Sequence, residues 1–225
     1  MLIALIRPTL SSARVSLPRR AIPSTPLIAA LASARTMSTL SDVIMHDHRE
    51  LEEYYDNILK ASSPDEKVRW QNQFTWELAR HSVGEEIVVY PVLQKQVSGG
   101  QQLADRDRAE HAKAKELLKK FQNMKPSDLD FDFTIETLFN DLKEHIKDEE
   151  RDDLPKLEEV LSREDSRSLA SEFERTKKFV PTRSHPSAPD KPVIAELEKP
   201  FETAMGLLVA PIDKLGDMLR RFPKE

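Results

Sequence analysis

The sequence predicts an all-α fold, an antiparallel up-down four-helix bundle with additional C-terminal helices. Three observations favour this class. The 225 residues include only five glycines, and 39% are hydrophobic and 32% charged, which is typical of a soluble helical protein rather than of a β-sandwich with its many turns. Apolar residues recur at intervals of three and four along four long segments. Short connections join these segments in pairs, which favours antiparallel neighbours.

Residues typical of helix ends support the bounds of the second, third and fourth helices. Ser63 and Pro64 suit the cap and the first position of the second helix. We expect Pro91 to kink that helix and Pro155 to end the fourth, because proline lacks the amide hydrogen that a helix interior needs. The sequence "SGG" separates the second helix from the third, and "KPSD" ends the third. The four helices are expected at residues 39–60, 64–97, 102–124 and 131–153, within a bundle domain that spans residues 39–161.

The chain beyond the bundle divides into three parts. An accessory amphipathic helix is expected within residues 162–180. Residues 181–200 contain five prolines and indicate an extended linker. Residues 201–225 predict an amphipathic helix, interrupted near Pro211, whose apolar side either packs against the bundle or contacts a partner or a membrane surface. Its apolar residues are Phe201, Met205, Leu208, Ile212, Leu215, Leu219 and Phe222.

Residues 1–38 predict a mitochondrial transit peptide. The first 41 residues contain five arginines, many serines and alanines and no acidic residue, which is typical of such peptides. A secretory signal fits less well because Arg7 interrupts the apolar stretch "LIALI", and a disordered arm is the remaining alternative. We therefore expect the protein in the mitochondrial matrix, with a cytoplasmic form if translation starts at Met37.

Composition excludes several other classes. The absence of cysteine excludes a disulfide, a thiolate metal ligand and a thiol nucleophile. The net charge is −5, and removing the five N-terminal arginines leaves −10 for the rest, so we expect no nucleic-acid partner. No apolar run reaches the roughly 18 residues of a membrane span, so no transmembrane segment is expected.

One polar motif occurs twice in the predicted bundle. "HSVGEEIVVYPVL" at residues 81–93 and "HIKDEERDDLPKL" at residues 145–157 share His-x3-Glu-Glu-x4-Pro-x-Leu, while the intervening residues differ. A single histidine precedes each motif by a similar interval, 33 residues from His48 to His81 and 34 from His111 to His145. The repeated unit is therefore a helix pair with a lone histidine on its first helix and His-x3-Glu on its second.

The repeated residues lie on the inner faces of the predicted helices. Side chains four residues apart leave a helix on one face, so His81 points with Glu85, and His145 with Glu149. Histidines satisfied by core neighbours are the alternative for any one position, but two buried carboxylates cost several kcal/mol each unless paired. A pair of metal ions removes that cost, and nitrogen and oxygen donors favour iron, manganese or zinc. The candidate metal ligands are His48, His81, Glu85, His111, His145 and Glu149.

This set of residues resembles the hemerythrin-like (HHE, cation-binding) domain family. "DHREL" around His48 and "EEIVVYP" after His81 strengthen the resemblance, which covers residues 40–160, and the layout is similar to fungal mitochondrial members. The resemblance implies a non-haem centre of two iron ions with an oxo or hydroxo bridge. Glu85 and Glu149 would span the two irons, and the repeat assigns His48 with His81 to one iron and His111 with His145 to the other.

The sequence departs from the oxygen-carrying hemerythrins at two positions. Those proteins have a second histidine four residues before the first on the third helix, and an aspartate five residues after the histidine on the fourth. Asp107 and Glu150 stand at the matching positions here and are additional candidate ligands. The alternative for Asp107 is an acidic residue on the surface. Glu150 and Glu86 are expected either to contact the metal ligands in a supporting layer or to be exposed. Asp47 is expected to accept a hydrogen bond from a metal-ligating histidine.

Three functions are open at this point. The first is non-haem iron redox chemistry on hydrogen peroxide, dioxygen or nitric oxide. The second is a sensor or buffer of iron or oxygen without turnover, and the third is a bundle with a purely structural metal. Oxygen carriage is not favoured, because the third-helix histidine of the carriers is replaced by Asp107.

Overall fold

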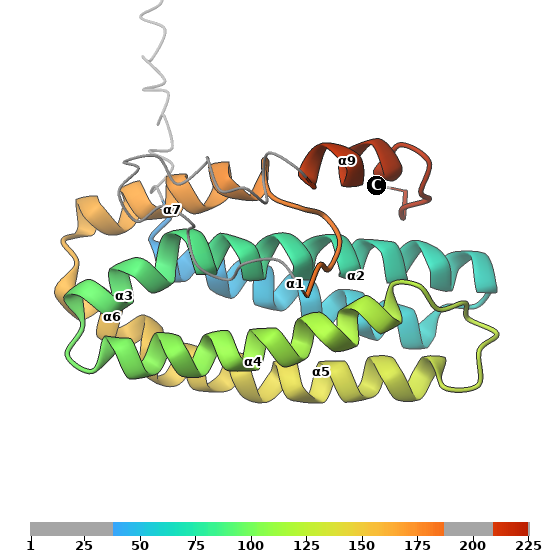
Figure 1. The fold of residues 1–225 in the computed structure, drawn as a ribbon, viewed down its shortest axis with the longest axis horizontal. Helices are drawn as coiled ribbons and strands as arrows, with labels where there is room; N and C mark the ends of the chain where they lie inside the picture. The colour runs from blue at the N-terminus through green and yellow to red at the C-terminus, as the bar shows by residue number, and fades with distance from the viewer. Residues whose placement is uncertain (1–37, 187–208, 225) are drawn as a thin grey trace, which may run out of the picture. The chain divides into compact units, whose positions relative to one another are not determined.

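The computed structural model describes residues 38–186 and 209–224, and all regular secondary structure in these two ranges is helical (Figure 1). This confirms the predicted all-helical class. In Figure 1 the connections between the long helices alternate between the two ends of the bundle. The four long helices are α1 (Leu40–Lys60), α2 (Pro64–Gly84), α4 (Gly100–Phe121) and α5 (Phe131–Asp148).

Helices α1 and α2 begin at side-chain caps. The Thr39 hydroxyl accepts a hydrogen bond from the amide of Asp42, whose carboxylate in turn accepts one from the Thr39 amide. The Ser63 hydroxyl accepts from the Glu66 amide, ahead of Pro64 in the first turn. These contacts satisfy amide groups that have no partner within the helix.

The repeated motifs form π-helical turns inside longer helices. Helix α2 passes through η1 (Glu85–Val89) into α3 (Tyr90–Gln96), and α5 passes through η2 (Glu149–Asp153) into α6 (Leu154–Val160). The prediction that Pro155 ends the fourth helix is therefore wrong. The π-turn lets the Leu154 amide bond to the Glu149 carbonyl five residues back, so the chain passes the proline without stopping.

Two glycines make the turn between α3 and α4. Gly99 has φ of 77°, a left-handed conformation that glycine adopts without strain. A Cβ atom on Gly100 would lie 1.9 Å from the Leu93 carbonyl oxygen, so only glycine fits where the two helices meet. Helix α4 consequently starts two residues before the predicted position.

The apolar core consists of two clusters with the repeated polar residues between them. On α1, Leu40 and Ile44 belong to one cluster and Leu51 and Ile58 to the other, with His48 in the middle. Helices α2 and α4 also contribute to both clusters, whereas α5 contributes to the second cluster and α6 to the first. The repeated polar residues therefore lie between two apolar layers.

Helix α7 (Arg163–Lys177) packs on the outside of the bundle against α1, α2 and η1. Its N-terminus is capped by Ser162, whose hydroxyl accepts from the Asp165 amide. Phe173 is fully buried and joins the same apolar cluster as Leu40. This helix corresponds to the predicted accessory helix.

Helix α9 (Ala210–Asp217) presents its polar side to the rest of the fold. Asp213 accepts hydrogen bonds from the amides of Thr182 and Arg183, both at 3.2 Å, and lies 2.9 Å from His185. Pro211 lies in the first turn of this helix. Residues 187–208, which precede Val209, lie outside the described ranges, so the expected interruption of a longer helix near Pro211 stays a prediction. Packing of the apolar stripe against the bundle, one of the two expectations, is wrong for three residues that are exposed: Ile212, Leu215 and Leu219. It is confirmed for Phe222, whose ring lies edge-on to that of Trp76 on α2, with centroids 6.5 Å apart.

Several sequence-based expectations fall on residues outside the described ranges. These are the transit peptide over residues 1–37, the linker from residue 187 and the apolar residues at 201–208. None of the described helices combines the length and the apolar character that a membrane span requires. Contact of the C-terminal helix with a partner or a membrane surface stays a prediction.

Candidate metal centre

The structure brings the six residues of the repeated motif together at the middle of the bundle. All six are buried, and they come from α1, α2, η1, α4, α5 and η2. Donor atoms of five of these residues form two groups, within each of which the atoms lie no more than 4.8 Å apart. The groups are His48, His81 and Glu85, and Glu85, His111 and His145.

Glu85 belongs to both groups because its two carboxylate oxygens face different histidines. Oε1 lies 3.3 Å from His81 Nε2, and Oε2 lies 3.4 Å from His111 Nε2. On the opposite side, Glu149 Oε2 lies 3.2 Å from His48 Nε2. The two glutamates therefore lie among four imidazoles, as the spacing of the motif predicted.

Each of the four histidines contacts an outer carboxylate through Nδ1. The Nδ1 atom of His48 lies 2.8 Å from Glu150 and that of His81 lies 3.1 Å from Asp47. An ionised carboxylate only accepts hydrogen bonds, so Nδ1 carries the proton and the lone pair of Nε2 points inward. The remaining two contacts are His111 Nδ1 to Glu86 at 3.3 Å and His145 Nδ1 to Glu110 at 2.8 Å.

The outer carboxylates follow the sequence repeat. Asp47 and Glu110 each precede a lone histidine and contact the histidine of the neighbouring motif. Glu86 and Glu150 each follow an inner glutamate and contact the lone histidine of the other half. The structure thus places Glu150 on the outer side of His48, which agrees with its expected place in a supporting layer. Its role as an additional ligand stays a prediction. Sequence reasoning missed Glu110, although the repeated acid–histidine pair was a usable signal.

Three of the four outer carboxylates have a cationic partner. Lys177 of α7 contacts Asp47, Lys115 contacts Glu86, and Arg49 contacts Glu150. Within residues 38–186 and 209–224, Glu110 makes no ion pair with a lysine or an arginine. The two halves of the centre therefore differ in their surroundings.

Helix α7 covers the His81 half. The Phe173 ring packs edge-on against the His81 ring, with centroids 6.0 Å apart. Gly84 permits this approach, because a Cβ atom there would lie 2.8 Å from Phe173 Cε2. Lys177 is 5% exposed and bridges Asp47 to Glu77, 2.7 Å away. An apolar ring and a buried ion pair thus separate His81 from solvent.

The inner donor atoms fit a metal pair. Five of them have no hydrogen-bond partner within the described chain, namely His48 Nε2, His81 Nε2, both oxygens of Glu85 and Glu149 Oε2. The Nε2 atoms of His111 and His145 lie 3.2 Å apart, and two lone pairs at that distance repel unless a proton or a metal ion lies between them. Buried polar atoms without partners are rare in folded proteins, and five of them gathered at one place fit a site that holds ions.

Without metal, the two inner glutamates have opposite electrostatic states. Burial and the charge of Glu149 raise the pKa of Glu85 well above its ordinary value. Burial also opposes ionisation of Glu149, but its contact with His48 lowers the pKa of Glu149 well below the ordinary value. The pKa of His48 rises to about 9, because Glu149 and Glu150 outweigh the effect of burial. A positive charge is therefore favoured at His48, whereas burial lowers the pKa of His111 to about 4 and also lowers the pKa of His81.

Asp107 is buried one turn before His111. Arg106 donates to Asp107 Oδ1 at 3.0 Å, while Oδ2 has no partner within the described residues. Burial and the charge of Asp153 raise the pKa of Asp107 to about 7. Its donor atoms group with Glu110 and His145 rather than with Glu85. Asp107 is thus an inner residue, not the surface acid of the alternative.

Tyr90 is a neighbour of the centre that sequence reasoning missed. Its hydroxyl lies 3.0 Å from His111 Nε2, and the residue is fully buried. Burial and the charge of Glu85 raise the pKa of Tyr90 well above 10, so it stays a neutral phenol. Its place in the sequence "EEIVVYP" carried no separate signal.

Comparisons with known proteins agree with this site. The family model of the hemerythrin HHE cation binding domain matches residues 39–157. An uncharacterized hemerythrin-like protein of Schizosaccharomyces pombe is 53% identical over 188 residues, which cover 83% of this chain and 89% of that protein. A DNA nickase of Nostoc is 25% identical over 146 residues, 64% of this chain and 40% of the nickase.

A solved structure supports the fold. The crystal structure of a hemerythrin HHE cation binding domain-containing protein from Mycobacterium kansasii superimposes with a TM-score of 0.55 at 21% identity, covering 63% of this chain and 86% of that one. The matched family model covers all six inner residues found by spacing and geometry. The chain therefore belongs to the hemerythrin HHE cation binding domain family.

Proposed function

We propose that the centre binds two iron ions. The observation that carries this proposal is the sharing of Glu85 between two groups of donors, each of which contains two histidines. His48 and His81 would hold one ion and His111 and His145 the other, with Glu85 and Glu149 between them. Nitrogen and oxygen donors without sulfur suit iron, and manganese or zinc are the alternatives.

We further propose that the bound pair acts on a small oxidant such as hydrogen peroxide, dioxygen or nitric oxide. Two redox-active ions side by side supply the two electrons that reduction of a peroxide bond requires. The protein contributes orientation, because the outer carboxylates fix the imidazoles with Nε2 inward. The two apolar clusters lie on either side of the centre along the bundle and limit the access of water from both ends.

Access for a small molecule favours chemistry over a structural metal. A cavity of about 220 Å³ reaches His111 and His145 from the surface between α4 and α5. A purely structural ion needs no such opening, since structural sites are closed by their ligands. The second candidate function, a sensor or buffer of iron or oxygen, uses the same opening and differs only in the absence of turnover.

Hydrogen peroxide consumption by the iron-loaded protein tests the proposal. We expect repeated turnover in which two peroxide molecules yield one dioxygen and two waters, with an optical change in the iron bands. Glu85→Gln should abolish turnover, while Glu116→Gln, an exposed glutamate on α4, should leave it unchanged. A reversible optical change without peroxide consumption would instead support a sensor or buffer.

A further inference from the structure

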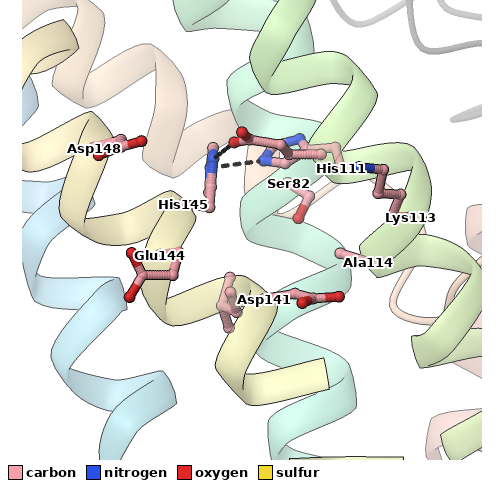
Figure 2. Close-up of a pocket in the computed structure, with 10 residues that line it drawn as sticks. Ser82, His111, Lys113, Ala114, Asp141, Glu144, His145 and Asp148 are labelled. Carbon is pink, nitrogen blue, oxygen red and sulfur yellow. Dashed lines mark hydrogen bonds and ion pairs between the residues drawn. The ribbon is translucent and has the colours of Figure 1, made fainter. Parts of the chain in front are cut away.

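The cavity between α4 and α5 joins the His145 half of the centre to the surface. Figure 2 shows His111 and His145 facing each other, with Asp141, Glu144 and Asp148 along the same helix as His145. His111 and His145 are at least 95% buried, so the cavity ends on the candidate metal donors themselves.

The cavity lining is strongly acidic. It contains four carboxylates, from Glu110, Asp141, Glu144 and Asp148, and one lysine, Lys113. Exposed partners on α5 and η2 neutralise this charge only in part, because Lys147 and Arg151 are about 60% exposed and such pairs are weak. A concave surface with one sign of charge concentrates the opposite ion.

A group of three possible metal donors adjoins this cavity, and two of the three residues line it. Asp107, Glu110 and His145 offer three donor atoms within 4.8 Å of one another. Asp107 is fully buried and its Oδ2 has no partner within the described residues, while Glu110 and His145 also line the cavity. The acidic lining therefore leads to an unsatisfied buried carboxylate beside the centre.

Within residues 38–186 and 209–224, the His81 side of the centre is covered where the His145 side is open. Asp47 corresponds to Glu110 in the repeat, but the buried ammonium of Lys177 occupies its outer side. Phe173 covers His81, which corresponds to His145. A cation that approached from this direction would meet a buried positive charge and an aromatic ring.

We propose that the cavity between α4 and α5 is the route by which a divalent metal ion reaches the centre, with Asp107, Glu110 and His145 as its inner binding point. This inference rests on the metal centre proposed above. According to this proposal, the two halves of the nearly symmetric centre have different roles. The His145 half admits the ion, and the His81 half is sealed by α7.

The rate of Co²⁺ uptake by the apo full-length protein tests this route. Binding is followed by the visible absorption of Co²⁺ after rapid mixing, and the final stoichiometry is measured separately. Replacing Asp141 by Asn and Glu144 by Gln should slow uptake roughly three- to tenfold at low salt, and replacing both by Lys should slow it further. The differences should vanish at high salt, because ionic screening removes the attraction of exposed charges.

A matched double variant controls for net charge. Glu53→Gln with Asp56→Asn removes the same two charges from a second surface hollow, lined by α1 and α5. Circular dichroism at the working temperature verifies that all apo variants have equal helicity. Equal uptake rates in wild type and both Asp141/Glu144 variants, or equal slowing in the control, would overturn the proposed route. A final stoichiometry other than two ions per chain would contradict the two-metal centre instead, so the two failures are distinguishable.

Discussion

Lys177 of α7 forms a buried ion pair with Asp47 of α1, 130 residues earlier in the chain. Asp47 in turn contacts the Nδ1 atom of His81. Burial opposes ionisation of Asp47, but His81 and Lys177 together lower its pKa to about 2, so the carboxylate stays charged. A helix beyond the matched family domain thus supports an inner histidine.

Lys177→Met should therefore weaken metal binding. Loss of the ammonium leaves Asp47 and Glu77 buried without their shared cation, and supporting contacts of this kind change metal affinity by about 10- to 100-fold. Competition with a coloured chelator measures the affinity. Lys178→Met, at an exposed neighbouring position, should bind metal as wild type does. Equal affinities in both variants would exclude this role of α7.

Removal of the metal should lower the melting temperature markedly. Ions that bind only the folded chain stabilise it, and without them five inner donor atoms have no partner among the described residues. Calorimetry with and without chelator measures the difference. Identical melting temperatures would contradict the site.

The two inner glutamates should respond oppositely to replacement in the apo protein. Glu85→Met should stabilise it by about 1–4 kcal/mol, because neither oxygen of Glu85 has a hydrogen-bond partner among the residues that the structure describes. Glu149→Met should destabilise it by about 3–5 kcal/mol, because it leaves His48 buried without its nearest inner carboxylate. Urea unfolding in the presence of chelator measures both changes. Equal effects of the two replacements would contradict the electrostatic difference between them.

The inner site was predictable from sequence because helix geometry is regular. Residues four apart share a face, so His81 with Glu85 could be assigned to the interior without coordinates. The supporting layer was only partly predictable. Asp47 was identified, but Lys177 depends on how α7 docks, which no local pattern encodes. Tyr90 was missed for a similar reason, since an aromatic residue in a helix packs in the core far more often than beside a metal.

Two predictions about helices failed for physical reasons. Pro155 was expected to end a helix, but a π-turn beginning at Glu149 absorbs the missing hydrogen bond. The apolar stripe of α9 was compatible with either orientation, because periodicity identifies a face and not what covers it. Asp213 settles the orientation by accepting amide hydrogen bonds from residues 182 and 183.

We propose that residues 1–36 direct mitochondrial import, on the basis of their arginines and their lack of acids. A fluorescent reporter fused to residues 1–41 should locate to the matrix. Replacing Arg7, Arg14, Arg19 and Arg20 by Gln should reduce import, because the positive charge is removed. A wild-type fusion that remains in the cytosol would disprove the targeting proposal.

Metal content tests the two-iron centre most directly. The full chain is produced in iron-replete cells, purified without chelator and analysed for iron, manganese and zinc per chain. The shared position of Glu85 predicts two iron ions in wild type and a large loss of metal in Glu85→Gln, with helicity unchanged. One zinc ion and no iron in the wild-type protein would contradict the account.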